Sequence, residues 1–316
     1  MTRVAAVDCG TNSIRLLVAD VDPATGGLVE LDRRMTIVRL GQGVDRTGRL
    51  APEALERTFA ACREYAGIIR EHGVEGPSAG GAGRIRFVAT SASRDAENRD
   101  EFVRGVAGIL GVGPEVISGD QEAEFSFTGA TRGLPGHEER LVVDIGGGST
   151  EFVIGRGRVE AARSVDIGCV RLTERHMRGD PPAPREIAAV RADIEAALDL
   201  AGETVPIREA GTLIGLAGSV TTVAGIALGL DAYDSEAIHH SRVSRDRVAE
   251  ITERLVRSTR EERAAIPVIH PGRVDVITAG ALVLLAVMDR AGVPEVVVSE
   301  HDILDGIAYS CATEAR

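Results

Sequence analysis

One short pattern occurs twice in this chain, and it constrains the fold more than any other feature. The first copy is Val7–Val18 and the second is Val143–Ile154. In each copy an apolar run ends in Asp, a turn of small residues follows, and a second apolar run begins after Ser. Aligned without a gap, the Val, Asp, Gly and Ser positions coincide. Each copy therefore predicts a strand, a tight turn and a second strand.

The turns also indicate a chemistry. A turn of small residues exposes backbone N–H groups that can cradle a phosphate, and an adjacent Asp can hold a divalent cation. If the two turns face each other, they form a clamp for a phosphate chain and its metal ion.

The rest of the sequence repeats the same order of elements around each copy. In the first half strands are expected at 4–8, 13–20, 28–38, 84–89 and 116–117, with helices at 52–72, 95–110 and 121–131. In the second half strands are expected at 141–144, 151–154, 158–165, 212–216 and 296–298, with helices at 171–177, 184–201, 218–226, 243–258, 274–291 and 302–312. Three strands followed by alternating helices and strands, repeated once, predict two similar α/β domains around a central cleft.

Composition excludes several mechanisms. All 36 basic residues are Arg, so the chain has no Lys. A P-loop ATPase, a protein kinase and a Schiff-base enzyme each need a Lys, and these three classes are excluded.

Net charge and cysteine content limit the binding partners and the cellular location that can be expected. The net charge is −12, so a nucleic-acid surface is not expected, and any polyanion must be held by local Arg side chains, backbone amides and metal. No apolar run reaches membrane-spanning length and no signal layout begins the chain, so a membrane location is not expected. The four Cys residues are scattered, which favours a reduced, cytoplasmic protein.

Five stretches, in order, resemble the exopolyphosphatase and guanosine pentaphosphate phosphohydrolase (Ppx/GppA) family. They are 90–94, 117–123, 144–151, 168–174 and 271–280. The duplicated hairpins are similar to those of the wider acetate kinase, sugar kinase, heat-shock protein and actin superfamily. The resemblance spans about residues 4–310 and fits the short, two-domain members.

The resemblance implies two actin-like (ribonuclease H-like) domains with mixed sheets flanking the cleft. We expect the first domain at 1–124 and the second at 125–316, with the last helix, 302–312, able to pack back on the first. The implied activity is metal-dependent release of terminal phosphate from inorganic polyphosphate. Guanosine pentaphosphate is the alternative substrate, and a homodimer is what the family implies.

The resemblance assigns the general base to Glu122. Hydrolysis of a phosphoanhydride needs a positioned water and a base that orients it. From the residues alone, an ordinary acidic residue in the first turn of a helix is the plainer interpretation of Glu122, and the resemblance reverses that preference. Gln121 stands where family members often have a second Glu.

Metal binding is expected at Asp144 and Glu151, which flank the second turn, with Asp8 as the counterpart in the first. Carboxylates together with substrate phosphates are the usual way to hold Mg²⁺, and Mn²⁺ can take its place. Asp144 and Asp8 can instead close their turns by bonding nearby N–H groups.

The expected phosphate contacts come from both turns and from one Arg side chain. They are Asn12, Ser13, Arg94, Gly146, Gly147, Gly148, Ser149 and Thr150. Arg94 suits a forked contact to phosphate, although a solvated residue at a helix start is the plainer interpretation. A plain hairpin turn is likewise the alternative for the glycine run.

Two further functional classes remain open. One is an ATP-dependent sugar or carboxylate kinase on the same fold, and the other is a non-catalytic sensor of guanosine tetraphosphate or polyphosphate. The intact Glu122 argues against the sensor.

Overall fold

The computed structural model describes residues 1–314 except 23–24, 26, 75–83, 133 and 135–137. The chain divides into two compact units, Met1–Arg132 together with Ile303–Arg316, and Gly133–Asp302. Each unit is built around one mixed sheet, which confirms the predicted α/β class.

The first unit has a five-stranded sheet in the order β3-β2-β1-β4-β5. Its strands are β1 (Thr2–Cys9), β2 (Ser13–Val21), β3 (Leu28–Ile37), β4 (Ile85–Ala89) and β5 (Glu115–Val116). Neighbours among β1, β2 and β3 are antiparallel, whereas β4 and β5 run parallel to β1. Its helices are α1 (Val44–Thr47), α2 (Pro52–Glu71), α3 (Ser91–Asp95), α4 (Arg99–Leu110), α5 (Gly119–Thr131) and α13 (Ile303–Glu314).

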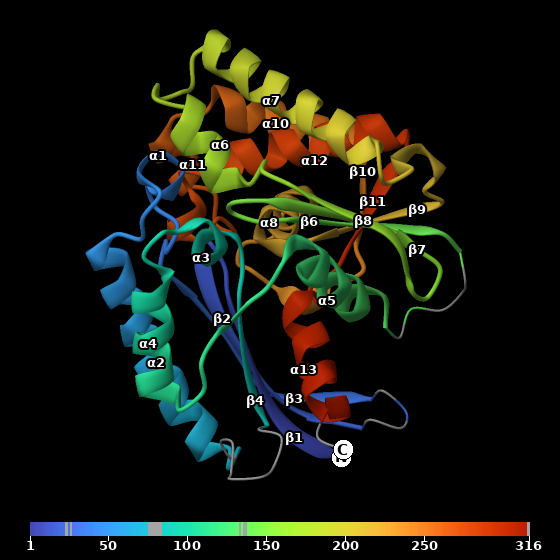
Figure 1. The fold of residues 1–316 in the computed structure, drawn as a ribbon. Coiled ribbons are helices and arrows are strands. Elements are labelled where there is room, and N and C mark those ends of the chain that lie inside the picture. Colours follow the sequence, from blue (N-terminus) through green and yellow to red (C-terminus); the bar gives the residue numbers. More distant parts are fainter. Residues whose placement is uncertain (23–24, 26, 75–83, 133, 135–137, 315–316) are drawn as a thin grey trace. The chain divides into compact units, whose positions relative to one another are not determined.

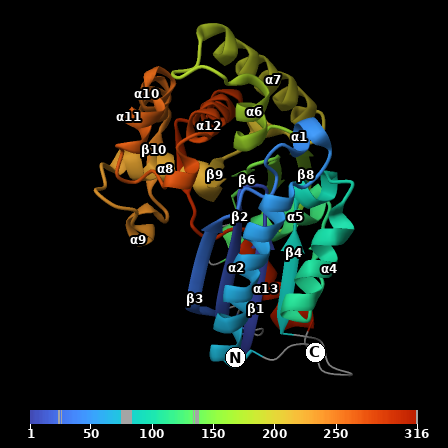
Figure 2. The ribbon, with the colours of Figure 1, turned by 90° about the vertical axis from the view of Figure 1, so that its left-hand side faces the viewer.

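Two helical layers cover this sheet. Side chains of α2 and α4, such as Tyr65 and Phe102, share a buried cluster with one set of strand residues. On the other face, Ile303 and Ile307 of α13 join the opposite-facing residues Val4 and Leu17. The alternation of strand side chains between the two faces produces these two separate clusters. Figure 1 shows α13 beside α5, and Figure 2 shows α2 and α4 along the strands.

The second unit has a six-stranded sheet in the order β10-β11-β9-β6-β7-β8. Its strands are β6 (Arg140–Ile145), β7 (Thr150–Gly155), β8 (Val159–Val165), β9 (Thr212–Leu216), β10 (Arg242–Ser244) and β11 (Glu295–Val298). Its helices are α6 (Cys169–His176), α7 (Pro184–Gly202), η1 (Ile207–Glu209), α8 (Ala217–Leu228), α9 (Ser235–Ile238), α10 (Arg245–Arg257), α11 (Arg260–Ala264), η2 (Pro271–Arg273) and α12 (Ile277–Ala291).

The two sheets repeat one topology. In each, two antiparallel hairpins are followed by two strands parallel to the first: β1-β2-β3 with β4 and β5, and β6-β7-β8 with β9 and β11. The strand β10 is an addition at the edge of the second sheet. The sequence duplication therefore corresponds to a duplication of the fold.

Several boundaries differ from the sequence expectations for local reasons. The segment expected as one helix at 243–258 begins as β10, because Val243 pairs with Val296, and the Ser244 side chain then caps α10. The helix expected at 95–110 begins four residues later, as α4 at Arg99, and Asp95 is instead the last residue of the short helix α3. The helix expected from 274 begins at Ile277, after the short turn η2.

Candidate phosphate and metal site

The second hairpin, β6 to β7, places two buried carboxylates side by side. Asp144 and Glu151 are register partners, so their side chains leave the same face of the sheet. They are 7% and 1% exposed. Ser164, the β8 residue beside Glu151, donates a hydrogen bond of 2.7 Å to Glu151 Oε1. This bond orients one carboxylate of the pair.

The carbonyl groups of the glycine turn are held by the start of α6. The N–H of Cys169 donates to Gly146 O at 3.0 Å, and the N–H of Val170 donates to Gly147 O at 2.9 Å. Arg171 Nε donates to Gly148 O at 2.7 Å. The carbonyl dipoles of the turn thus point toward α6.

The amides of the same turn remain available. Within the part of the chain that the structure describes, the N–H groups of Gly147 and Gly148 have no hydrogen-bond acceptor. A turn whose carbonyls are engaged and whose N–H groups are not is suited to an anion. Thr150 contributes differently, because it is fully buried and its hydroxyl donates to Ile167 O at 2.9 Å.

Gly168 allows this packing. A Cβ atom at Gly168 would lie 2.2 Å from Gly147 C and O and 2.3 Å from Gly148 N. Real Cβ atoms do not approach backbone so closely, so only Gly lets α6 reach the turn.

Arg273 lies against the start of α8 and acts electrostatically on Cys169, and sequence reasoning gave it no role. A Cβ atom at Gly218, at the start of α8, would come within 1.8 Å of Arg273 Cζ, so the guanidinium lies flat against that helix start. Burial raises the pKa of the Cys169 thiol, and the nearby Arg273 charge opposes that rise. The motif at 271–280 was the available signal for Arg273, because it places a cation directly before a helix.

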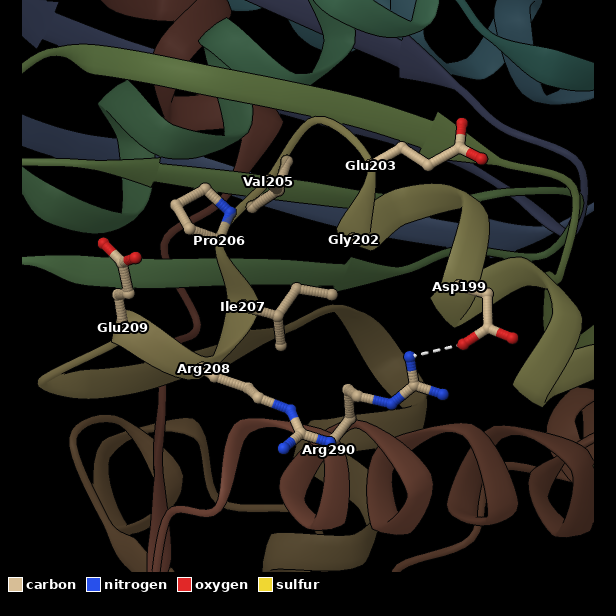
Figure 3. Close-up of a pocket in the computed structure, with 9 residues that line it drawn as sticks. All are labelled: Asp199, Gly202, Glu203, Val205, Pro206, Ile207, Arg208, Glu209 and Arg290. Atoms are coloured by element: carbon tan, nitrogen blue, oxygen red, sulfur yellow. Dashed lines mark hydrogen bonds and ion pairs between the residues drawn. The ribbon is translucent and has the colours of Figure 1, made fainter.

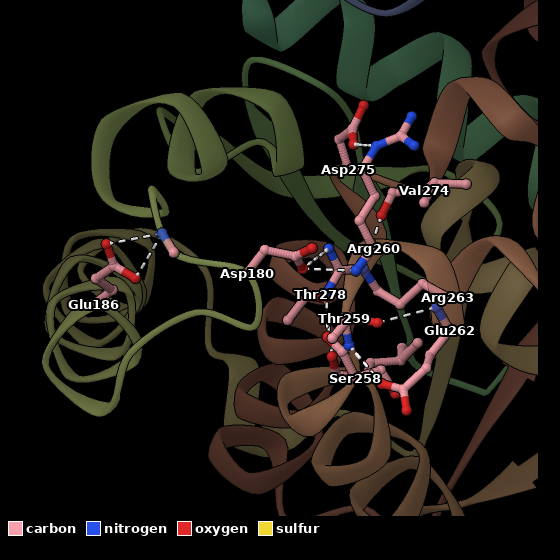
Figure 4. Close-up of polar contacts among 12 residues, drawn as sticks. Asp180, Glu186, Ser258, Thr259, Arg260, Glu262, Arg263, Val274, Asp275 and Thr278 are labelled. Carbon is pink, nitrogen blue, oxygen red and sulfur yellow. Dashed lines mark hydrogen bonds and ion pairs between the residues drawn. The ribbon is translucent and has the colours of Figure 1, made fainter.

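A polar cluster holds the two residues that follow Arg273 in the sequence, Val274 and Asp275 (Figure 4). Arg263 is 6% exposed and donates to Val274 O at 3.1 Å and Ser258 O at 2.6 Å. Arg260 Nε donates to Asp275 Oδ1 at 2.7 Å. The two residues that follow Arg273 are therefore both held by guanidinium groups.

The first hairpin is built on the same plan with a different charge. Asp8 is the register partner of Arg15, in the place where the second hairpin pairs Asp144 with Glu151. Arg15 donates to Asp8 Oδ2 through Nε at 3.0 Å and Nη2 at 2.7 Å. The carboxylate of Asp8 already has a cation from the protein.

Asn12 sits buried in the first turn. Its carbonyl oxygen accepts from the N–H groups of Val38 and Arg39, at 3.1 and 2.9 Å. Its side chain is different: the residue is 6% exposed, and neither amide atom has a hydrogen-bond partner among the described residues. A buried amide without a partner costs free energy unless a ligand or water completes it. Ser13 follows it at the start of β2 and is partly exposed.

Glu122 and Arg94 lie together in the first unit. Glu122 is 8% exposed in the first turn of α5, and Arg94 Nη1 is 3.3 Å from Glu122 Oε2. The start of α5 is fixed by a capping box, in which Ser118 Oγ accepts from the Gln121 N–H and Gln121 Oε1 accepts from the Ser118 N–H. Gln121 therefore holds the helix start, which explains an amide at that position.

The donor set near Asp144 fits Mg²⁺. It consists of oxygen atoms from two carboxylates, and Mg²⁺ is usually bound by one or two carboxylates while water and substrate phosphates fill the remaining positions. The described residues contain no group of three or more His, Cys, Asp or Glu side chains arranged for a metal. A site of two carboxylates therefore depends on its substrate to complete the coordination.

The pocket in Figure 3 is a separate feature of the second unit. It has a volume of about 420 Å³ and lies between the end of α7, η1 and Arg290 of α12. Arg290 donates to Asp199 at 2.8 Å and to Glu195 at 2.7 Å, so its charge is neutralised there. None of the residues expected in the site lines this pocket.

Two mixed sheets of one topology, each with a hairpin that carries an Asp before a turn of small residues, are typical of an α/β phosphatase. The model of the Ppx/GppA phosphatase family matches residues 17–315. The chain belongs to this family, as the five motifs predicted.

Relatives with curated names agree. Exopolyphosphatase 2 of Mycobacterium tuberculosis is 50% identical, and the match covers 99% of each chain. A guanosine-5'-triphosphate,3'-diphosphate pyrophosphatase of Vibrio atlanticus is 31% identical over 99% of this chain and 60% of its own length. Among solved structures, an exopolyphosphatase-like protein has a TM-score of 0.88 at 44% identity, with 97% of both chains covered. The Ppx/GppA protein of Aquifex aeolicus has a TM-score of 0.80 at 30% identity, covering 99% of this chain and 98% of its own.

Proposed function

We propose that this protein is an exopolyphosphatase that uses Mg²⁺ or Mn²⁺ to release terminal phosphate from inorganic polyphosphate. The observation that carries the proposal is the second hairpin. Its glycine turn offers the N–H groups of Gly147 and Gly148 to an anion, directly beside the carboxylates of Asp144 and Glu151. The 50% identity to an exopolyphosphatase over the full chain supports the same substrate.

Each residue has a proposed role. Glu122 orients a water molecule and accepts its proton while the water oxygen attacks the terminal phosphorus, and the bond from that phosphorus to the bridging oxygen breaks. The turn at 146–149, together with Asn12, Ser13 and Arg94, holds the phosphate groups, while Thr150, whose hydroxyl is bonded to Ile167 O, supports the turn from the strand. Asp144 and Glu151 would hold the cation, and the chemistry it would supply is neutralisation of charge on the transferred phosphoryl group. That both hairpins serve one site between the two domains remains a prediction.

The two cysteines next to the turns do not act as nucleophiles in this scheme. Burial raises the pKa of both the Cys9 and the Cys169 thiol. Both side chains therefore stay protonated at neutral pH, and a thiol is a poor nucleophile.

Guanosine pentaphosphate is the second candidate substrate, because a relative carries a name for that activity. It presents the same terminal phosphoanhydride, so the same residues serve it. We also propose a cytoplasmic homodimer without nucleic-acid partners. No described helix is long and apolar enough to cross a membrane. Light scattering of the purified protein tests the proposed homodimer.

One assay tests the proposal. Phosphate release is measured with polyphosphate, guanosine pentaphosphate and ATP side by side, with Mg²⁺, with Mn²⁺ and with excess chelator. We expect release from polyphosphate that requires the cation. Release only from guanosine pentaphosphate supports the second substrate, transfer from ATP to a sugar or carboxylate indicates a kinase, and binding without turnover indicates a sensor.

A further inference from the structure

Arg94 contacts both the helix that carries the proposed base and the backbone that leads into that helix. Its Nη1 atom donates to Ile117 O at 3.1 Å and lies 3.3 Å from Glu122 Oε2. Ile117 comes directly before Ser118, the cap of α5. One nitrogen atom thus holds both the backbone that leads into the helix and the carboxylate in its first turn.

Arg94 is itself tied to the first hairpin. Its N–H donates to Thr90 O at 3.0 Å, and the Thr90 N–H donates to Cys9 O at 3.2 Å, at the end of β1. The Thr11 and Ser91 hydroxyl groups share a hydrogen bond of 2.9 Å. The short helix α3 therefore links the turn of the first hairpin, between β1 and β2, to Glu122 through Arg94.

The rest of the guanidinium is unengaged. Among the described residues, the Nε and Nη2 groups of Arg94 have no hydrogen-bond acceptor, and its side chain is 26% exposed. A guanidinium has five N–H donors in a fixed plane, so one edge can hold a carboxylate while another binds a phosphate.

We infer that Arg94 is the positioning residue for Glu122, holding the carboxylate ionised and aimed while its remaining donors receive the terminal phosphoryl group. The inference rests on the proposed function and adds what fixes the charge and the orientation of the Glu122 carboxylate. A guanidinium 3.3 Å from a carboxylate attracts its charged form, which is the form that can accept a proton. The shared plane also fixes the distance between base and phosphoryl group.

Other ionisable groups lie on and around α5, and their charges also act on the titration of Glu122. On α5, at its end and on the elements that contact it they are Asp120, Glu124, Arg132, Tyr309, Arg86 and Asp305. The carboxylate of Asp305 accepts from Arg33 at 2.7 Å, and Arg132 lies over the Tyr309 ring at 4.2 Å. Arg86 lies over the Phe125 ring at 5.1 Å and is bonded to Glu115. Because these groups are unchanged in an Arg94 variant, a change in the titration of Glu122 reports the loss of Arg94.

The test compares wild type with Arg94→Ala, Arg94→Lys and the matched control Arg104→Ala, which removes one exposed Arg from α4. The pH dependence of kcat/KM is measured for each. We expect Arg94→Ala to lower kcat about 100-fold and to move the acidic limb of the profile to higher pH. Arg94→Lys should keep the limb near its wild-type position, because it keeps a cation, yet recover only part of kcat. Arg104→Ala should leave the profile in place.

If Arg94 serves phosphate binding alone, KM rises in Arg94→Ala while the limb does not move, and the inference is overturned. A second measurement does not depend on turnover. The Glu122 carboxyl resonance, identified by its loss in Glu122→Gln, is titrated by ¹³C NMR in wild type, Arg94→Ala and Arg94→Lys. A midpoint that rises in Arg94→Ala and returns toward wild type in Arg94→Lys supports the inference even if no substrate is hydrolysed and the proposed function fails. An unmoved midpoint in folded Arg94→Ala overturns it.

Discussion

Asp8 and Arg15 form an ion pair across the first hairpin, with Arg15 Nη2 at 2.7 Å from Asp8 Oδ2, where the second hairpin pairs two acids. The duplicated hairpins have thus diverged in charge. A cation from solution gains most where two carboxylates lie side by side, as the register partners Asp144 and Glu151 do. We therefore propose that the metal binds at Asp144 and Glu151 before Asp8.

This assignment predicts different results for Asp144→Asn and Asp8→Asn. Asp144→Asn should lose most activity and weaken Mn²⁺ binding at least 10-fold, since even indirect supports of a metal ligand are worth 10–100-fold in affinity. Asp8→Asn should keep Mn²⁺ affinity within about threefold but cost about 1–3 kcal/mol of unfolding free energy, because Arg15 loses its partner. Electron paramagnetic resonance titration and urea unfolding measure the two effects. Equal losses of Mn²⁺ affinity in both variants would contradict the assignment.

Glu122→Gln should separate catalysis from binding. The amide keeps the size of the side chain but cannot accept a proton, so kcat should fall about 10²–10⁴-fold. KM should stay the same or decrease, because a negative charge near a polyanion is removed. Steady-state kinetics together with calorimetric binding check both statements. If Glu122 were only a first-turn helix residue, kcat would be nearly intact and stability would drop by less than about 1 kcal/mol.

Gly168→Ala should damage the second turn through steric contact alone. The added methyl group would overlap Gly147 C and O at 2.2 Å, so we expect about 1–3 kcal/mol of destabilisation and a large loss of activity. Gly202→Ala is the matched control at the end of α7, where a Cβ atom meets nothing within 4 Å. It should be neutral or slightly stabilising, by up to about 1 kcal/mol. Unfolding and phosphate release measured on both variants test the pair, and a fully active Gly168→Ala protein would refute the packing argument.

His240 should make stability depend on pH. Burial, and then the neighbouring His301, lower the pKa of His240 in the folded protein. The unfolded chain, with an ordinary pKa near 6.5, therefore takes up the proton first, and the unfolding free energy should fall as the pH drops below about 6.5. His240 has a φ of 61°, a conformation that Asn also accepts.

His240→Asn removes the titrating group, and Asn tolerates the left-handed backbone conformation at this position. The loss of unfolding free energy between pH 7.5 and 5.5 should therefore become smaller. His240→Ala also removes the titration but strains the left-handed backbone, so it should be less stable at every pH. Urea unfolding at three pH values compares the variants. An unchanged pH dependence in His240→Asn would show that another group is responsible.

Much of the fold could be predicted because its signals are local. The duplicated hairpins have alternating strands and turns of small residues, and the helices at 52 and 184 begin at Pro in the first turn. The Val243 strand was missed because three residues carry no clear period, and its pairing with Val296 comes from a distant part of the chain. The pairing with a distant strand made this segment β-structure, although its local pattern predicted a helix.

The residues of the candidate site show the same difference between local signals and long-range contacts. The carboxylates of the second turn lie next to it in sequence, so a pattern could find them. The contact of Arg94 with Glu122 joins residues 28 positions apart, and the role of Arg273 depends on its approach to Gly218. Such relationships need the fold before they can be seen. The use of Gln121 as a cap was readable, because Ser followed three residues later by Gln is a known helix-start signal.

The placement of α13 has a consequence for synthesis on the ribosome. The second unit occupies the 170 residues from 133 to 302, yet the first unit is finished only by Ile303 and the residues after it. Val4, Ala6 and Leu17 of the first sheet pack against α13, so this apolar surface stays uncovered until Ile303 and the residues after it have been made. At ~5–20 residues per second the wait is roughly 10–35 s. The half of the protein that is made first is therefore completed last, and its sheet is the surface that a nascent-chain chaperone would have to shield.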